Sequence, residues 1–103
     1  MKTIEKNKLL LSIGSIYQQS KNCKLNGEIF KKVDSDLIEV SSYLDISKNQ
    51  AFLVANIFGL NYKCDYATIF YLAEHFECNP FELLFYKNDF DDLVNRKVLK
   101  RKE

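Results

Sequence analysis

The chain has 103 residues, a length typical of one domain with a modest hydrophobic core. Its formal net charge is only +1, so no strong overall field favours binding to nucleic acid or to a membrane surface. The longest apolar run, residues 51–60, is too short to span a bilayer, and no signal-peptide cleavage site follows the N-terminal lysines, so we expect no membrane contact.

The cysteines indicate the redox compartment. Cys23, Cys64 and Cys78 are odd in number and lie at unrelated spacings. A disulfide framework needs paired cysteines, whereas unpaired thiols are typical of reducing compartments. We therefore expect reduced thiols and a cytoplasmic localisation.

The N-terminal part of the chain, residues 1–45, is predicted to be helical. Residues 4–20 have an apolar stripe and a polar opposite face, and a polar break follows at 21–27. A second segment repeats apolar residues at alternating steps of three and four, at Phe30, Val33, Leu37, Val40 and Leu44. The polar run at 34–36 can interrupt this segment, so one long helix and two short helices both fit the pattern.

A central helix is predicted over residues 48–58. Ser47 and Gln50 have the spacing of a capping box, in which each side chain bonds the other residue's backbone amide. The residues that follow are apolar on nearly every face, and a helix of that kind is buried on every face. We expect Gly59 to end this helix. A polar connection at 61–65 and a very short strand at 66–67 are predicted next.

Residues 66–101 have the pattern of a helix-turn-helix followed by the first strand of a wing. Thr68 is the predicted cap of the first helix. The inward face of that helix has the spacing of one helical stripe and consists of Ile69, Leu72, Ala73 and Phe76. After a turn at 77–78, Asn79 and Pro80 begin the second helix. Its inward residues are Leu83, Tyr86, Phe90 and Leu93.

These elements predict a mainly α fold in a single domain, 1–103. N-terminal helices (1–45) pack on a winged helix-turn-helix-like part (46–103) whose wing is truncated. A wing is a hairpin, and no return strand follows the strand predicted at 98–101. We therefore expect the chain to be the N-terminal module of a longer protein.

Catalytic and metal-binding patterns are weak. His75 and Cys78 lie one helical turn apart with Cys64 upstream, but this spacing matches no paired zinc-ligand motif. The same His75 and Cys78 are the sole nucleophile–base pair that the sequence offers. No phosphate-binding glycine loop occurs. We predict no catalytic, cofactor-binding or metal-binding residues, and hence a chain that is not an enzyme.

Nucleic-acid binding is the main alternative. The early residues of the second helix, which would read base edges, are Phe81, Glu82, Leu84 and Phe85, and none reads guanine bidentately. Basic residues lie instead in the predicted wing, at Lys97, Lys100, Arg101 and Lys102. In this alternative they contact the phosphate backbone, helped by lysines near the N-terminus.

Outward aromatic residues favour a protein contact. Phe70 and Tyr71 lie off the inward stripe of the first helix, and Phe81 and Phe85 lie off that of the second. Clustered exposed aromatic residues are typical of protein interfaces. The N-terminal helices can instead fold over this surface and cover it, and the sequence leaves both arrangements open.

One stretch resembles a known family. The run 72–80, Leu-Ala-Glu-His-Phe-Glu-Cys-Asn-Pro, continues with Phe-Glu-Leu-Leu and the acidic run 89–94. It resembles the winged-helix-like segment near the N-terminus of a family of bacterial AAA-type ATPases, over roughly residues 43–101. Glu77 stands where that pattern usually has glycine. The resemblance implies a downstream nucleotide-binding domain, none of whose ATPase residues lie in this chain.

We therefore predict a non-catalytic interaction or regulatory module that binds through Phe70, Tyr71, Phe81 and Phe85. Its partner would be another protein or the downstream ATPase domain. DNA binding through the wing residues is the second hypothesis. The third is self-association as a homodimer through the apolar seam at 30–44.

Overall fold

The computed structural model describes residues 3–61 and 68–99, with side chains from residue 7 onward, and within them the protein is mainly helical with no strand. The N-terminal elements are α1 (Thr3–Ser20), α2 (Glu28–Lys32) and α3 (Asp34–Leu44). The helices α4 (Lys48–Asn61) and α5 (Ile69–Phe76), the 3-10 helix η1 (Pro80–Tyr86) and α6 (Lys87–Asn95) follow. The strand predicted at 66–67 lies outside the described residues.

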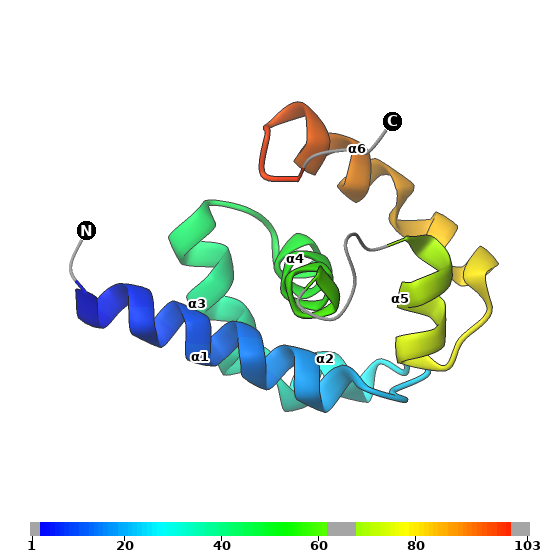
Figure 1. Ribbon diagram of the computed structural model, residues 1–103, viewed down its shortest axis with the longest axis horizontal. Coiled ribbons are helices and arrows are strands. Elements are labelled where there is room, and N and C mark those ends of the chain that lie inside the picture. Colours follow the sequence, from blue (N-terminus) through cyan, green and yellow to red (C-terminus); the bar gives the residue numbers. More distant parts are fainter. Residues whose placement is uncertain (1–2, 62–67, 100–103) are drawn as a thin grey trace.

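Helix α4 is central, as predicted. Figure 1 looks along it and shows the other helices arranged around it. Residues 50–56 are all buried, and α4 packs on α1, α3, α5 and α6. The capping box is confirmed, because the Ser47 amide donates to Gln50 Oε1 at 3.0 Å and the Gln50 amide donates to Ser47 Oγ at 3.1 Å.

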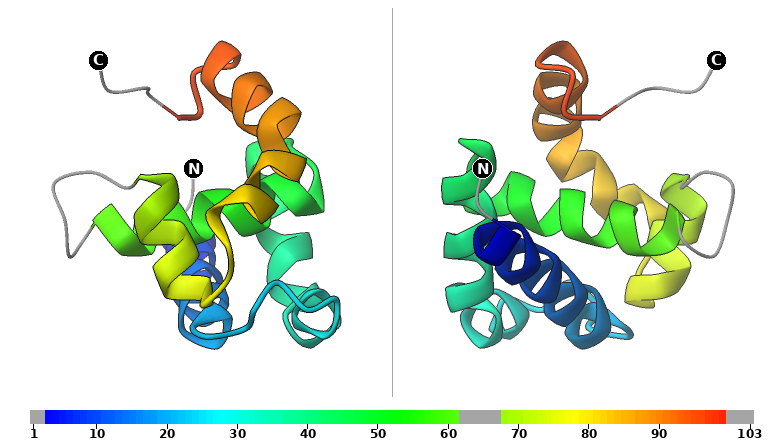
Figure 2. Two further views of the ribbon diagram at one scale, coloured as in Figure 1. Left: turned by 90° about the vertical axis from the view of Figure 1, so that its right-hand side faces the viewer. Right: turned by 60° about the vertical axis from the view of Figure 1, so that its left-hand side comes forward.

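The prediction that Gly59 ends the central helix is wrong, because α4 continues to Asn61. The ring of Tyr17 lies directly against Gly59 where α1 crosses α4, a crossing visible in the right view of Figure 2. A Cβ atom at this position would come within 2.2 Å of Tyr17 Cδ1. Glycine is therefore needed for the close approach of two helices.

The apolar seam at 30–44 forms two helices that meet at Val33 and face the protein's own core. Val33, Leu37 and Val40 are buried, and α3 packs on α1 and α4. Phe30 contacts Phe52 with ring centroids 4.7 Å apart. The apolar side chains of this seam therefore pack mainly within the chain, and self-association stays a prediction that the burial of Val33, Leu37 and Val40 does not favour.

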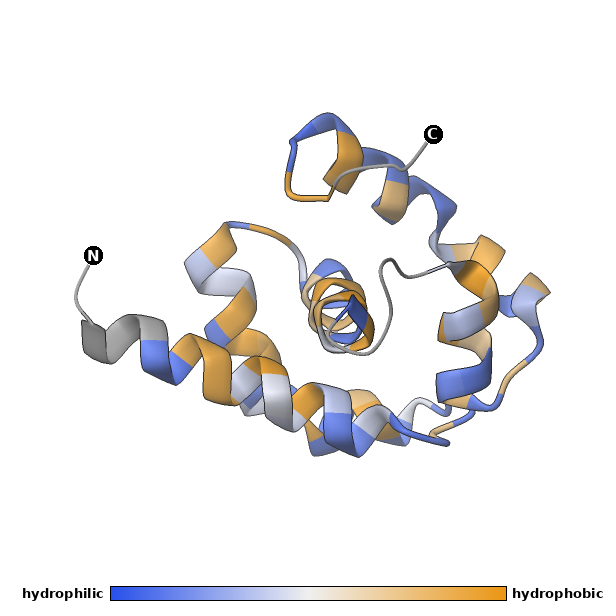
Figure 3. Cartoon of the chain, viewed as in Figure 1, coloured by the Kyte–Doolittle hydropathy of each residue, from blue (hydrophilic) through white to orange (hydrophobic). Residues whose placement is uncertain are grey.

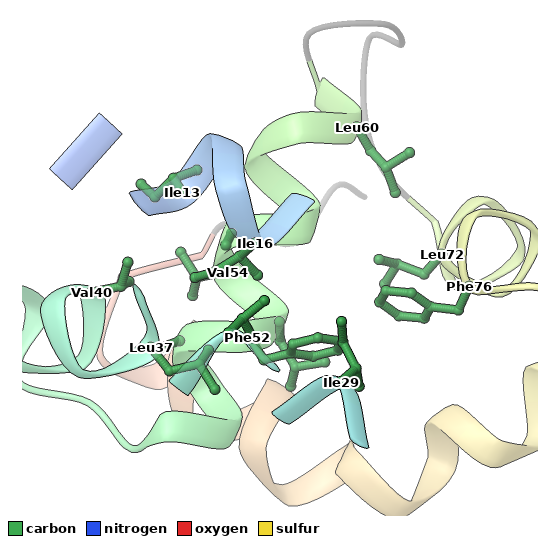
Figure 4. Close-up of a cluster of buried hydrophobic side chains, with 14 of the residues drawn as sticks. Ile13, Ile16, Ile29, Leu37, Val40, Phe52, Val54, Leu60, Leu72 and Phe76 are labelled. Carbon is green, nitrogen blue, oxygen red and sulfur yellow. The ribbon is translucent and has the colours of Figure 1, made fainter. Parts of the chain in front are cut away.

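One hydrophobic core joins the N-terminal and C-terminal parts. The labelled side chains in Figure 4 come from α1 to α5 and converge around Phe52. Leu83 of η1 and Leu93 of α6 are also completely buried in this core. A hydrogen bond of 2.7 Å from Gln50 Nε2 to Asp92 Oδ2 holds α6 against α4.

Helix α5 follows the prediction except at its first residue. Thr68 Oγ1 accepts a hydrogen bond from the Tyr71 amide at 3.2 Å, which confirms the cap. Leu72, Ala73 and Phe76 are buried, but Ile69 is 40% exposed. The inward stripe therefore begins at Leu72, one turn later than predicted, because Ile69, the first residue of the helix, lies outside the core.

The predicted second helix is divided into η1 and α6. Its cap is confirmed, because Asn79 Oδ1 accepts a hydrogen bond from the Phe81 amide at 2.9 Å. A 3-10 helix has three residues per turn, so Pro80, Leu83 and Tyr86 form one inward row. The prediction of a single α-helix is therefore wrong for residues 80–86.

The strand predicted at 98–101 is wrong for residues 98 and 99, and residues 100 and 101 lie outside the described part. Lys97 is left-handed, with φ 62°, and ends α6 in a Schellman motif. The Val98 amide donates to the Leu93 carbonyl at 2.9 Å, and the Leu99 amide donates to the same oxygen at 3.2 Å. The backbone amides of Val98 and Leu99 are therefore bonded to the end of α6 and do not pair with another strand.

Helix α5 ends in the same motif at Glu77, whose φ is 59°. The Cys78 amide donates to the Ala73 carbonyl at 2.9 Å, and the Glu77 amide donates to the Glu74 carbonyl at 3.2 Å. A non-glycine residue therefore occupies the left-handed position of this turn. The tight turn places η1 directly beside α5.

Candidate interaction surface

The four aromatic residues predicted to face outward are all exposed. The exposed fractions are 74% for Phe70, 44% for Tyr71, 75% for Phe81 and 87% for Phe85. Leu84, which the sequence analysis did not include among them, is 52% exposed. We call these five residues the aromatic face. The N-terminal helices do not bury it, which decides the question that the sequence left open.

The aromatic face lies on the helix α5 and the 3-10 helix η1, each of which has buried residues in the core. Helix α5 turns Leu72, Ala73 and Phe76 into the core, so Phe70 and Tyr71 lie on its other side. Both elements lie on one side of the molecule, at the right in Figure 1, and the left view of Figure 2 looks onto that side. Figure 3 shows hydrophobic residues, in orange, in both elements.

The 3-10 geometry of η1 arranges its outer residues in two rows. With Leu83 in the inward row, Phe81 and Leu84 form one outer row, and Glu82 and Phe85 form the other. In an α-helix Phe81 and Phe85 would share one face. The helix type therefore broadens the apolar surface that η1 exposes.

A hollow of about 300 Å³ lies beside the second outer row. It is lined by Lys24, Leu25, Glu82, Phe85 and Tyr86. Lys24 and Leu25 were not predicted to be parts of this surface, because no local sequence pattern connects them with η1. They lie there because the turn after α1 is bonded to the end of α5.

Two backbone hydrogen bonds hold that turn in place. The Asn22 amide donates to the His75 carbonyl at 2.7 Å, and the Lys24 amide donates to the Phe76 carbonyl at 2.6 Å. The turn also contains left-handed residues, with φ between 54° and 61° at Asn22, Lys24 and Leu25. This irregular backbone uses the carbonyl groups that the end of α5 leaves unpaired.

The surroundings of the aromatic face are acidic. Glu74 is exposed on α5, one turn after Phe70 and Tyr71, and Glu82 is exposed on η1. Glu77 is paired with Lys24 Nζ at 3.6 Å. Residues 68–99 contain six acidic and three basic residues.

His75 belongs to a buried polar network beneath this surface. Its Nε2 lies 3.0 Å from Asn56 Oδ1, and its ring stacks on Tyr17 with centroids 4.5 Å apart. Asn56 Nδ2 donates to the Phe52 carbonyl at 2.9 Å and to Ser20 Oγ at 3.2 Å. Asn56 and Ser20 are completely buried. In this network His75 connects α5 with α4 and α1.

Cys78, three residues after His75, carries a thiol with a raised pKa. Burial raises the pKa of this thiol, the nearby Glu82 carboxylate raises it further, and together they bring it to about 11. Burial also raises the pKa of Cys23. Both are free thiols. High pKa values oppose the thiolate form that a nucleophile requires.

We expect stability to fall at alkaline pH. The folded protein keeps the Cys78 proton up to a pKa of about 11, whereas the ordinary value is 9.0, so only the unfolded chain ionises between them. The contribution of this thiol to stability is complete below pH 9 and is lost as the pH rises toward 11. The Tyr86 pKa is raised too, mainly by burial, and acts in the same direction.

Thermal unfolding of Cys78→Ala and of the wild type, each followed from neutral pH to about pH 11, checks this expectation. The variant should lose less of its neutral-pH stability than the wild type. Cys64→Ser serves as the control for a thiol elsewhere in the chain. Equal losses in all three proteins would show that Cys78 does not titrate abnormally.

The described residues contain no metal cluster and include one of the four residues of the predicted basic wing. No group of three His, Cys, Asp or Glu side chains in the described ranges has the arrangement to hold a metal ion. Among the alternative nucleic-acid residues, Lys97 is exposed at the end of α6. Lys100, Arg101 and Lys102 lie outside the described part, as does Cys64.

Comparison with known proteins adds no further guide to this site. The chain matches no family model, no curated protein and no solved structure. Within residues 3–61 and 68–99, no helix is both long and apolar enough to cross a membrane. Function must therefore be inferred from the geometry and chemistry of the surface itself.

Proposed function

We propose that this chain is a non-catalytic protein-interaction module that binds a partner through the aromatic face. The observation that carries the proposal is the exposure of Phe70, Phe81 and Phe85, each at least 74% accessible, on elements anchored by buried residues. Aromatic residues are enriched among those that dominate binding energy at protein interfaces. A large exposed apolar surface on a folded protein is typical of a binding site.

The surface chemistry favours a protein partner over DNA. The residues that η1 exposes are Phe81, Glu82, Leu84 and Phe85. Apolar and acidic side chains neither neutralise phosphates nor form the bidentate contacts that read guanine or adenine. The same residues suit a desolvated contact with another protein.

The proposal extends to the architecture that the resemblance implies. Residues 46–103 would be a winged-helix-like module preceding the motor domain of a bacterial AAA-type ATPase, and that domain or a separate protein would be the partner. The capped α5, the left-handed turn at Glu77 and the capped η1 support the helix-turn-helix-like part.

Replacing Phe81 and Phe85 together by serine is expected to raise solubility and abolish partner capture. Both side chains are at least 75% exposed, so the substitutions should change the free energy of unfolding by only about 0.5 kcal/mol each. Immobilised wild-type and variant proteins would be used to capture partners, identified by mass spectrometry. Circular dichroism would verify the fold of each protein.

The matched control is Leu11→Ser, since Leu11 is 75% exposed on α1, away from the aromatic face. It should leave capture unchanged. Unfolding of the Phe81 and Phe85 variant would show that these residues belong to the core and that the assignment is wrong. Salt-sensitive binding of generic duplex DNA by the wild type would instead favour the nucleic-acid alternative.

A further inference from the structure

The hollow beside η1 combines an apolar wall with an exposed carboxylate. Leu25, Phe85 and Tyr86 provide the apolar part, and Glu82 lies in the same outer row as Phe85. Its volume of about 300 Å³ is at the lower end of the range for small-molecule sites, about 300–1,000 Å³. A hollow of this size suits one large side chain of a partner better than a whole cofactor.

Some charged residues of this surface have an ion-pair partner and others have none. Lys24 is the cation in its lining, and its ammonium group is paired with Glu77. Glu74 and Glu82 have no cationic partner among the described residues. An incoming segment would therefore meet the unpaired carboxylate of Glu82 in the lining of the hollow and that of Glu74 on α5, one turn after Phe70 and Tyr71.

We infer that the partner presents a basic, apolar segment to the aromatic face, with an apolar side chain in the hollow and Lys or Arg side chains against Glu74 and Glu82. This inference rests on the proposed function and names the chemistry of its partner. Opposite charges across an interface accelerate association and exclude wrongly charged partners. An apolar segment flanked by carboxylates would be repelled by the same two residues.

Three synthetic peptides of about 18 residues, labelled for fluorescence anisotropy, provide the probes. The first has Leu and Phe on one helical face and Lys on the other. The second replaces every Lys by Glu, and the third keeps Lys but replaces Leu and Phe by Gln. At low ionic strength the first should bind the full chain at least about tenfold more tightly than either of the others.

Two sets of variants identify the contact. Glu74→Gln combined with Glu82→Gln should weaken binding of the first peptide about tenfold. Glutamine keeps the shape of each residue and removes only its charge. The control Glu39→Gln, on α3, should have no effect. Phe85→Ser should abolish binding of the first peptide, because it removes the most exposed side chain of the aromatic face and a large part of the apolar wall.

The outcomes separate this inference from the proposed function. If Phe85→Ser abolishes binding but the glutamine variant binds normally, or if the second peptide binds as tightly as the first, the charge inference is wrong and the aromatic face stands. Equal binding of the third peptide, or no binding of any peptide, also overturns the inference. If Phe85→Ser leaves binding unchanged, the aromatic face itself is not the interaction site.

Discussion

Replacing Gly59 by alanine is expected to lower the free energy of unfolding by about 2 kcal/mol. The new Cβ would lie 2.2 Å from Cδ1 and 2.4 Å from Cγ of Tyr17. These atoms are near the base of the ring, so a change at the tip of the side chain cannot relieve the clash. Tyr17 also stacks on His75, so moving the ring disturbs a second contact.

Helix propensity acts in the opposite direction and is too small to compensate. Alanine is favoured over glycine inside a helix by about 1 kcal/mol, whereas overpacking typically costs about 1–3 kcal/mol and the lost ring contact about 0.5–1.5 kcal/mol. Gly14→Ala is the matched control, because Gly14 lies within α1 and a Cβ there would meet no atom within 4 Å.

Gly14→Ala should therefore stabilise the protein by about 0.5–1 kcal/mol, with a sign opposite to that of Gly59→Ala. Urea unfolding followed by circular dichroism measures both changes. Stabilisation by both substitutions would mean that α1 does not approach α4 as closely as the structure shows.

Replacing Asn56 by leucine is the second substitution with a large expected effect, a loss of about 2–4 kcal/mol. Asn56 is completely buried, and its Nδ2 donates to the Phe52 carbonyl and Ser20 Oγ. Its Oδ1 is an acceptor, so His75 Nε2 carries the hydrogen of their contact. Leucine removes the Asn56 oxygen that accepts from the Nε2–H group of His75.

The two other groups in the network are less affected, because Ser20 Oγ also donates to the Ile16 carbonyl and the Phe52 carbonyl lies within the helix α4. Asn49→Leu is the matched control, since Asn49 is exposed on the same helix and its replacement should change stability by at most about 0.5 kcal/mol. The measurement is again urea unfolding. A loss at Asn56 no larger than that at Asn49 would show that the buried network contributes little to stability.

Local chemistry made several features of the fold predictable. The caps at Thr68 and Asn79 and the capping box at Ser47 and Gln50 were correctly predicted, because each depends on residues three positions apart or fewer. The burial of α4 was predictable because its residues are apolar on nearly every face. The prediction that four aromatic side chains face outward is confirmed, because these residues lie off the inward stripes that the spacing of apolar residues predicts.

Predictions failed where contacts outside an element, or the hydrogen bonds at a helix end, decide the local conformation. Gly59 was expected to end a helix, yet its role depends on Tyr17, which is far away in the sequence. The sequence pattern did not distinguish the 3-10 form of η1 from an α-helix, because Leu83 and Tyr86, three residues apart, fit the inward face of either. The bonds of Val98 and Leu99 to the end of α6 replaced the expected strand.

By itself the sequence determined the helical character of this protein, most helix starts, the central position of α4 and the outward direction of Phe70, Tyr71, Phe81 and Phe85, since periodicity and capping act over one or two turns. Only the tertiary structure decided that the N-terminal helices leave these aromatic residues uncovered. It also brought Lys24 and Leu25 beside Phe85 to form the hollow. The physical reason is that this contact depends on hydrogen bonds between the turn after α1 and the end of α5, groups more than fifty residues apart.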